Sequence, residues 1–302
     1  MVRRRFLLTS LAGVATPEAQ SKVVIARGAP NALALLDKAM QSFFDCDSPI
    51  EAWKRVVRPG EVVGLKVNCL AGRGNSTSVA LVEAICERLQ QAGIAQKDIV
   101  VWDRLTSDLE HGGFRIGSRR DRIRYVGNDA ASYEDELATF GSAGSLLSRT
   151  LTRASNVVIN LPVLKDHGIV GVTMALKNLF GAIHNPNKYH LNAGDPYVAD
   201  VWMLPPIRQK VRLTICDAIA AQYEGGPSFM PQWIWPFNGL LVAKDPVALD
   251  SVGWQIIEQK RAEKGMKSLK AAGREPAYIA TAADARHRLG TNDPRRIRRV
   301  DV

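Results

Sequence analysis

The amino-acid sequence predicts an α/β fold in which helices cover both faces of a mostly parallel sheet. Short segments rich in Val and Ile alternate along the chain with segments whose apolar residues recur at helical spacing. Most of the strand-like segments are near-continuous apolar runs, which is typical of strands buried on both faces. With 302 residues, 46% of them hydrophobic, the chain can bury the core of one large domain or of two closely packed lobes.

Seven segments are predicted to form strands, because each is a short run enriched in β-branched residues between polar or turn-forming residues. They are residues 22–27, 61–68, 98–103, 122–127, 156–162, 211–217 and 239–245.

Two longer segments are predicted to form helices. Residues 78–93 carry apolar side chains at i, i+3, i+4 and i+7 counted from Val82, and Gly93 follows as a typical helix stop. Residues 245–265 open with Asp245, a favoured N-cap residue, followed by a proline in the first turn.

Residues 1–20 resemble an export signal. An arginine run precedes a short apolar stretch that ends in small residues. Arg3 and Arg4 resemble the twin-arginine motif of proteins that fold before export. We therefore expect an extracytoplasmic protein, periplasmic or secreted, with no membrane span after signal removal, because the apolar run is too short. If the segment is only a basic tail, the protein is cytoplasmic. Residues 22–302 are expected to form one domain with a basic C-terminal tail.

The net charge and the cysteine spacing limit which ligands and cofactors we expect this protein to bind. The formal net charge is +10 at pH 7, but no zinc-finger spacing, RNA-binding aromatic motif or helix-turn-helix accompanies it. Nucleic acid is therefore not an expected partner, whereas a small anionic molecule is. The four cysteines lie far apart without a C-x-x-C pair, so we expect no iron-sulfur cluster held by this chain.

The ends of the predicted strands carry candidate site residues, because ligands of such sheets gather where strands end and loops begin. The loop after residues 61–68 is glycine-bearing and runs into a helix whose N-terminus can receive an anion. An ordinary turn with a serine cap explains the same pattern. The candidate cofactor-binding residues in and beside this loop are Lys66, Asn68, Arg73, Ser76 and Thr77.

Two further strands end in acidic or titratable residues. Asp103, Arg104 and His111 follow one strand, and Asp217 and Glu224 follow another. Acidic groups there can orient a histidine or bind a metal, but they also cap helices.

The segment 160–190 concentrates chemistry-bearing residues. Lys177 and Asn178 follow a run of small residues and are candidate cofactor-binding residues. Histidine carries protons or binds metals near neutral pH. His167 and His111 are therefore candidate catalytic residues, together with the acidic Asp217. His184 and His190 are candidate metal ligands. Each histidine alone is also explained as a hydrogen-bonding loop residue.

Four motifs taken together resemble the DUF362 family, a domain of unknown function. They are "GLKVN", "NLPVLKDHGIVGVTMALKNLFG", "DAIAAQYEGGP" and "LLVAKDPVALDSVG", and the resemblance spans residues 62–253. Some members of that family carry ferredoxin-like cysteine motifs, which this sequence lacks.

The spacing of His167 and Lys177, with a histidine downstream, is also similar to an arrangement in the lactate racemase family. That resemblance implies that Lys177 tethers a nickel-pincer nucleotide, that His190 or His184 binds the metal, and that His167 and His111 transfer protons. The loop after residues 61–68 departs from that family's cofactor-loop pattern.

Three functional hypotheses follow. The first is an extracytoplasmic enzyme that uses a metal or cofactor of unknown identity to transfer a proton or hydride on a small anionic substrate. The second is a non-catalytic protein that binds a metal or an anion through the same residues. The third is an accessory factor for a partner enzyme, for which the basic C-terminal residues are the only indication.

Overall fold

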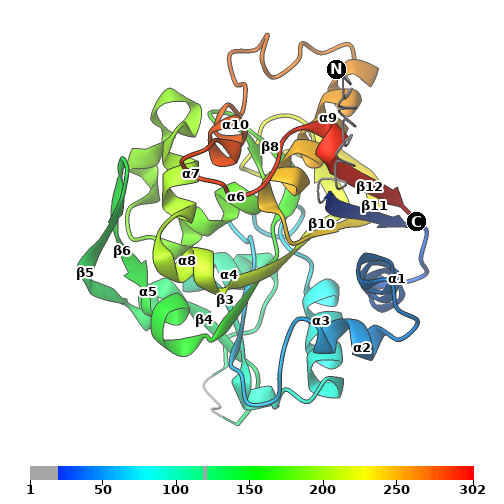
Figure 1. Cartoon of the computed structure of the whole chain (residues 1–302), viewed down its shortest axis with the longest axis vertical. Helices are drawn as coiled ribbons and strands as arrows, with labels where there is room; N and C mark the ends of the chain where they lie inside the picture. The colour runs from blue at the N-terminus through cyan, green and yellow to red at the C-terminus, as the bar shows by residue number, and fades with distance from the viewer. Residues whose placement is uncertain (1–19, 118–120) are drawn as a thin grey trace, which may run out of the picture.

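The computed structural model describes residues 20–117 and 121–302, so the signal-like segment lies outside the described residues. Its centre is a ten-stranded sheet in the order β12-β1-β11-β10-β7-β2-β3-β4, with β8 paired to β10 and β9 paired to β8 (Figure 1). The bounds are β1 Ser21–Arg27, β2 Val63–Lys66, β3 Ile99–Asp103, β4 Arg124–Gly127, β7 Val157–Asn160, β8 Val163–His167, β9 Gly171–Thr173, β10 Val211–Gln222, β11 Ile234–Ala243 and β12 Ile297–Asp301.

The sheet is mixed but mostly parallel. Parallel pairing runs from β10 through β7, β2 and β3 to β4, so these strands end at one edge of the sheet. Only β11 and the short β9 run against their neighbours. The predicted α/β class with a mostly parallel sheet is thereby confirmed.

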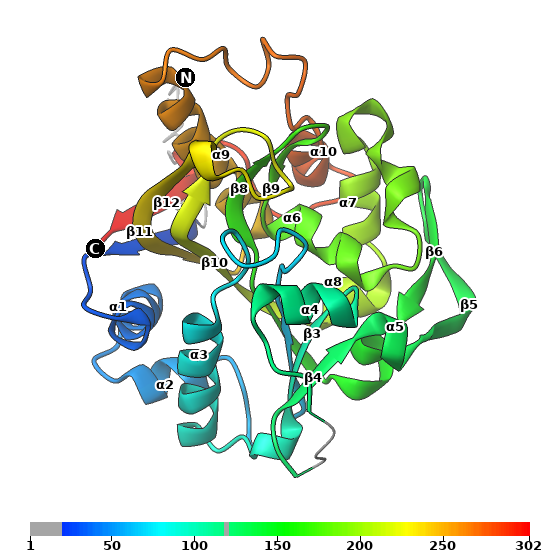
Figure 2. The ribbon, with the colours of Figure 1, turned by 180° about the vertical axis from the view of Figure 1, so that it is seen from behind.

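Helices cover both faces, as predicted. Along β1, Val23 and Ile25 face one apolar core while Val24 and Ala26 face the other. The core on the side of Val24 is closed by α1 Ala32–Phe44, α2 Pro49–Lys54, α3 Val79–Gln91 and α4 Thr106–Gly112. The other core is closed by α6 Ala175–Asn178, α7 Tyr197–Trp202, α8 Pro205–Lys210, α9 Pro246–Glu263 and α10 Tyr278–Ala283. Figures 1 and 2 show the two groups on opposite sides of the sheet.

Local signals placed the two predicted helices correctly. Ser78 caps α3 by accepting a hydrogen bond from the Leu81 amide, and Asp245 caps α9 by accepting from the amides of Val247 and Ala248. Each cap satisfies backbone donors that the first helical turn leaves free.

Several strands were not predicted. A separate hairpin, β5 Tyr133–Phe140 and β6 Ala143–Ser148, lies outside the main sheet. It was not predicted because β5 contains acidic residues, which are uncommon in strands. Beyond Pro162 the chain continues as β8, although its sequence "VLKDH" reads as a loop. The basic C-terminal residues, expected to be a tail, end in the edge strand β12 beside β1.

Candidate functional site

The ends of the parallel strands surround a cavity of about 400 Å³, which is within the size range of small-molecule sites. Its walls come from the loops after β2, β3 and β8, from α6, and from the 3-10 helix η4 Pro186–Gly194. The charged and titratable lining residues are Lys66, Asp103, Arg104, Asp108, His167, Lys177 and His190.

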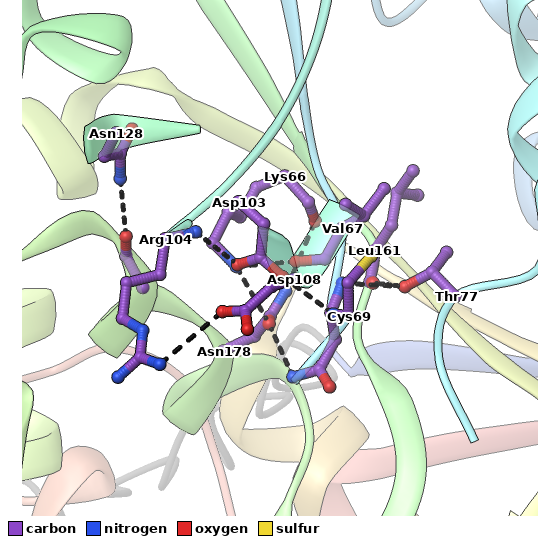
Figure 3. A network of polar contacts seen from close by, with 12 residues as sticks. Lys66, Val67, Cys69, Thr77, Asp103, Arg104, Asp108, Asn128, Leu161 and Asn178 are labelled. Atoms are coloured by element: carbon purple, nitrogen blue, oxygen red, sulfur yellow. Dashed lines mark hydrogen bonds and ion pairs between the residues drawn. The ribbon is translucent and has the colours of Figure 1, made fainter. Parts of the chain in front are cut away.

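Lys66 is the centre of a buried network at the wall of this cavity (Figure 3). Its ammonium donates to Asp103 Oδ1 at 2.7 Å, to the Val67 carbonyl at 2.6 Å and to Asn178 Oδ1 at 3.2 Å. An ammonium has three N–H groups, so these contacts use all of them. Asp103 also accepts from the Cys69 amide at 2.7 Å, which ties the loop after β2 to the end of β3. Lys66 therefore holds the wall together.

Asn178 connects the network to α6. Its Oδ1 accepts from Asn68 Nδ2 at 3.0 Å, and its own Nδ2 donates to Asn160 Oδ1 at 2.8 Å. The start of α6 is fixed by Asp250 of α9, whose carboxylate accepts from the Ala175 and Leu176 amides at 2.7 and 3.0 Å. Burial raises the pKa of Asp250 to about 8, and the two amides act against that rise. A carboxyl group outside the cavity thus orients the helix that carries Asn178.

Lys177 differs from Lys66 because nothing anionic contacts it. Only 8% of the residue is exposed, and its Nζ lies 4.0 Å from the centroid of the Phe180 ring. Among the described residues no hydrogen bond or ion pair is made by this ammonium. Burial, followed by the nearby cations Lys66, Arg104 and Lys165, lowers the pKa of Lys177 to about 7. Lys177 is thus a buried amine whose N–H groups are available to a ligand.

His167 and His190 lie side by side at the cavity, with ring centroids 5.4 Å apart. Nδ1 of His167 accepts from the amides of Ile169 and Val170 at 3.1 and 3.3 Å, so the proton of the neutral ring is on Nε2. Nδ1 of His190 lies 3.2 Å from the Asn187 carbonyl, which only accepts, so that nitrogen carries the proton and Nε2 keeps its lone pair. One ring therefore offers a donor and the other an acceptor.

Both histidines are held in the neutral form. Burial lowers the pKa of His167 to about 2, and the nearby Lys177 ammonium is the next cause. Burial also lowers the pKa of His190, again with Lys177 as the largest charge effect. A neutral imidazole is the form that exchanges protons or binds a metal.

The charges at the cavity leave a positive excess. Lys66 is paired with Asp103, and Arg104 is 3.5 Å from Asp108. Burial, followed by the Asp103 carboxylate, raises the pKa of Asp108. No carboxylate in the described part of the chain pairs with Lys177, so an anion is the ligand that this cavity favours.

Several predicted site residues lie elsewhere. His111 is exposed on α4 and does not line the cavity, and Arg73 is exposed in the loop after β2. His184 packs edge-on against the Tyr133 ring at 4.9 Å and lines a neighbouring cavity, because its amide is bonded to the Leu146 carbonyl of β6. The structure therefore does not bring His184 together with His167 and His190.

Three others shape the loop rather than face the cavity. Asp217 accepts from the Ser78 amide at 2.8 Å and from the Ile219 amide at 3.0 Å, and burial raises its pKa. The Ser76 hydroxyl donates to the Gly72 carbonyl, and that of Thr77 to the Leu161 carbonyl, both at 2.7 Å.

In residues 20–117 and 121–302, no group of three or more His, Cys, Asp or Glu side chains is placed to hold a metal ion.

Asp103 and Arg104, noted at the end of a predicted strand but given no role, line the cavity, as do Asp108 and Phe180, which were not among the candidates. Asp103 and Arg104 end a predicted strand beside the one that ends at Lys66. Phe180 has only its i+3 spacing from Lys177 as a signal.

Comparison with known proteins gives the family. Residues 63–255 match the family described as Domain of unknown function (DUF362). The chain belongs to the DUF362 family. It is 30% identical over 256 residues to a thylakoid-associated protein of Synechocystis sp., covering 81% of this chain and 73% of the relative.

One solved structure is loosely similar to this chain. It is a crystal structure of a protein from Thermotoga maritima, with a TM-score of 0.43 and 9% identity. The alignment covers 77% of this chain but only 60% of that one, which is less than two thirds.

No helix among the described residues of the DUF362 protein has the length and apolar character needed to cross a membrane.

Proposed function

We propose that this DUF362 protein binds a small anionic organic molecule in the cavity at Lys177 and moves a proton on it with His190 and His167. The observation that carries the proposal is the unpaired Lys177 ammonium, only 8% exposed. Buried charges are normally paired, because removing a charge from water is costly. The Phe180 ring face, 4.0 Å away, offsets only part of that cost. A bound carboxylate, sulfonate or phosphate would supply the missing partner.

The two histidines support proton transfer. His190 Nε2 has a lone pair that accepts a proton from the ligand, and the His190 imidazolium formed in this way returns that proton to a second atom of the ligand. The Nε2–H of the neutral His167 donates a hydrogen bond to the negative charge that develops on the ligand in between. Removal at one atom and delivery at another leave the composition of the ligand unchanged. The reaction class is therefore an isomerisation, and it needs no external oxidant.

Deuterium exchange tests the chemistry. The protein is incubated in deuterated water with short 2-hydroxy carboxylates, and loss of the α-proton signal is followed by NMR. We expect exchange with the parent protein, retained binding without exchange in His190→Ala, and loss of both in Lys177→Met. Lys97→Met, an exposed lysine before β3, is the matched control. Binding that depends on Lys177 without any exchange in the parent would instead support the non-catalytic anion-binding function.

A covalent cofactor is a distinct use of Lys177. Because Lys177 and His190 line one cavity, a lysine-tethered metal cofactor remains part of the proposal. The intact mass of protein from its native host checks this. A mass increment that is absent in Lys177→Arg indicates a tether, whereas partial retention of anion affinity in that variant indicates a charge contact only.

Function outside the cytoplasm is also part of the proposal. The arginine run and apolar stretch of residues 1–20 support it, and a relative bears the name of a thylakoid-associated protein.

A further inference from the structure

The mouth of the cavity carries large apolar side chains that are half exposed. Leu70 is 51% exposed and Ile169 is 53% exposed, and both line the cavity. Phe229, 39% exposed, lies over Gly74 of the same loop as Leu70. Single exposed apolar residues are ordinary on a protein surface. Here they share one rim.

The fold holds this rim in place. The Ile169 amide donates to Nδ1 of His167, so the turn that presents Ile169 also sets the tautomer of that histidine. The Gly168 amide donates to the Gly226 carbonyl at 2.7 Å, which joins this turn to the β10–β11 connection. Leu70 follows Cys69, whose amide is bonded to Asp103. Because backbone hydrogen bonds fix these loops, the apolar rim is preorganised for a ligand.

Polarity follows depth in the cavity. Lys66 and Asn178 are 1% and 3% exposed and belong to its closed part. Leu70 and Ile169 stand at the open part, and Pro227 lines the same cavity. A molecule that fills the cavity therefore meets Lys66 and Asn178 at its buried end, and at its outer end the apolar side chains of Leu70 and Ile169 together with the exposed polar Asn187.

We propose that the ligand is an anionic amphiphile, whose head group contacts Lys177 and whose apolar portion covers Leu70 and Ile169. This inference rests on the proposed function, because it takes the anion site at Lys177 as given. The head group is a carboxylate, sulfonate or phosphate ester, and its source is either a free amphiphile or a lipid of a bilayer.

Calorimetry with n-alkanoates from acetate to octanoate, each below its micelle-forming concentration, tests the inference. Affinity for the parent protein should rise roughly three- to fourfold per methylene group as the tail covers the rim. Leu70→Ser combined with Ile169→Ser should flatten this dependence and leave acetate binding unchanged. Leu137→Ser is the matched control, because Leu137 is 62% exposed on β5 and does not line this cavity.

The outcomes separate this inference from the proposed function. If acetate binds through Lys177 but chain length has no effect on affinity, the amphiphile inference is overturned and the anion site stands. A chain-length dependence that survives in the Leu70, Ile169 double variant also overturns it. If no alkanoate binds and Lys177→Met changes nothing, the proposed function itself fails.

Vesicles containing phosphatidylglycerol identify the source of the ligand. Co-sedimentation that is lost in the Leu70, Ile169 double variant supports a bilayer lipid. Rim-dependent octanoate binding without co-sedimentation supports a free amphiphile.

Discussion

Replacing Lys177 with Met should stabilise the protein at pH 6 while weakening anion binding. Burial lowers the pKa of Lys177 from 10.5 to about 7. At about 1.4 kcal/mol for each pKa unit, this difference destabilises the folded state by on the order of 4–5 kcal/mol when the lysine is protonated in both states. Met keeps the length of the side chain but loses the cation–π contact with the Phe180 ring, which is worth about 2 kcal/mol for a pair removed from water. A net gain of roughly 2–3 kcal/mol is expected.

The pH dependence of this gain has a definite sign. Below pH 7, Lys177 is protonated in the folded and the unfolded protein, so the destabilisation is complete. Between about pH 7 and 10.5 only the unfolded state keeps the proton, so the free energy of unfolding of the parent rises with pH. The advantage of Lys177→Met should therefore shrink as pH rises and vanish near pH 10.5.

Urea denaturation of the parent and Lys177→Met at pH 6, 8 and 9.5 measures this difference. Burial lowers the pKa of Lys165 as well, and because Lys165 is present in both proteins, the cost of its own burial is common to both. Lys97→Met should change the free energy of unfolding by less than about 0.5 kcal/mol. Equal stability of Lys177→Met and the parent at pH 6 would refute the view of Lys177 as a buried, unpaired cation.

Three more predictions address the support of the site, its metal and its export. Asp250→Ala should lower the free energy of unfolding by about 2–3 kcal/mol and weaken anion binding, because the first amides of α6 lose their acceptor. Asp250→Asn keeps one acceptor oxygen, so it should show smaller effects in the same urea and calorimetry assays. Metal analysis of protein from its native host should show less bound metal in His190→Ala at unchanged thermal stability, and equal metal in both would exclude His190 as a ligand. Replacing Arg3 and Arg4 with Lys should block export, and undiminished mature protein outside the cytoplasm would exclude the twin-arginine route.

The sequence predicted the fold wherever one physical effect dominated. Buried parallel strands are Val- and Ile-rich runs, so β2, β3 and β7 were found. It failed where effects competed. In β8, Pro162 and the polar residues that follow it indicate a loop, yet every position of that strand is buried because its charged groups find partners far along the chain. Asp166, for example, pairs with Arg274 at 2.9 Å.

The candidate site was predictable in part for the same reason. Parallel strands end together, so residues at the strand ends were candidates for a site, and of these Lys66 and His167 line one cavity. The burial of Lys177 could not be predicted, since a lysine on a short helix is usually solvated and only the tertiary packing of α6 against α7, α9 and β9 removes it from water. The position of His184 depends on the hydrogen bond from its backbone amide to the Leu146 carbonyl of β6. No sequence pattern predicts that hydrogen bond.

The pairing of β1 has a consequence for the order of folding. Val24 pairs with Val242 on one side and with Val300 on the other, so both neighbours of the first strand come from the last quarter of the chain. During synthesis β1 must wait unpaired until β11 has left the ribosome, and contacts so distant along the chain form slowly. The segment before Ser21 therefore remains attached to an unfolded strand while the centre of the sheet assembles. A factor that recognises residues 1–20 in the nascent chain would have that entire interval in which to bind.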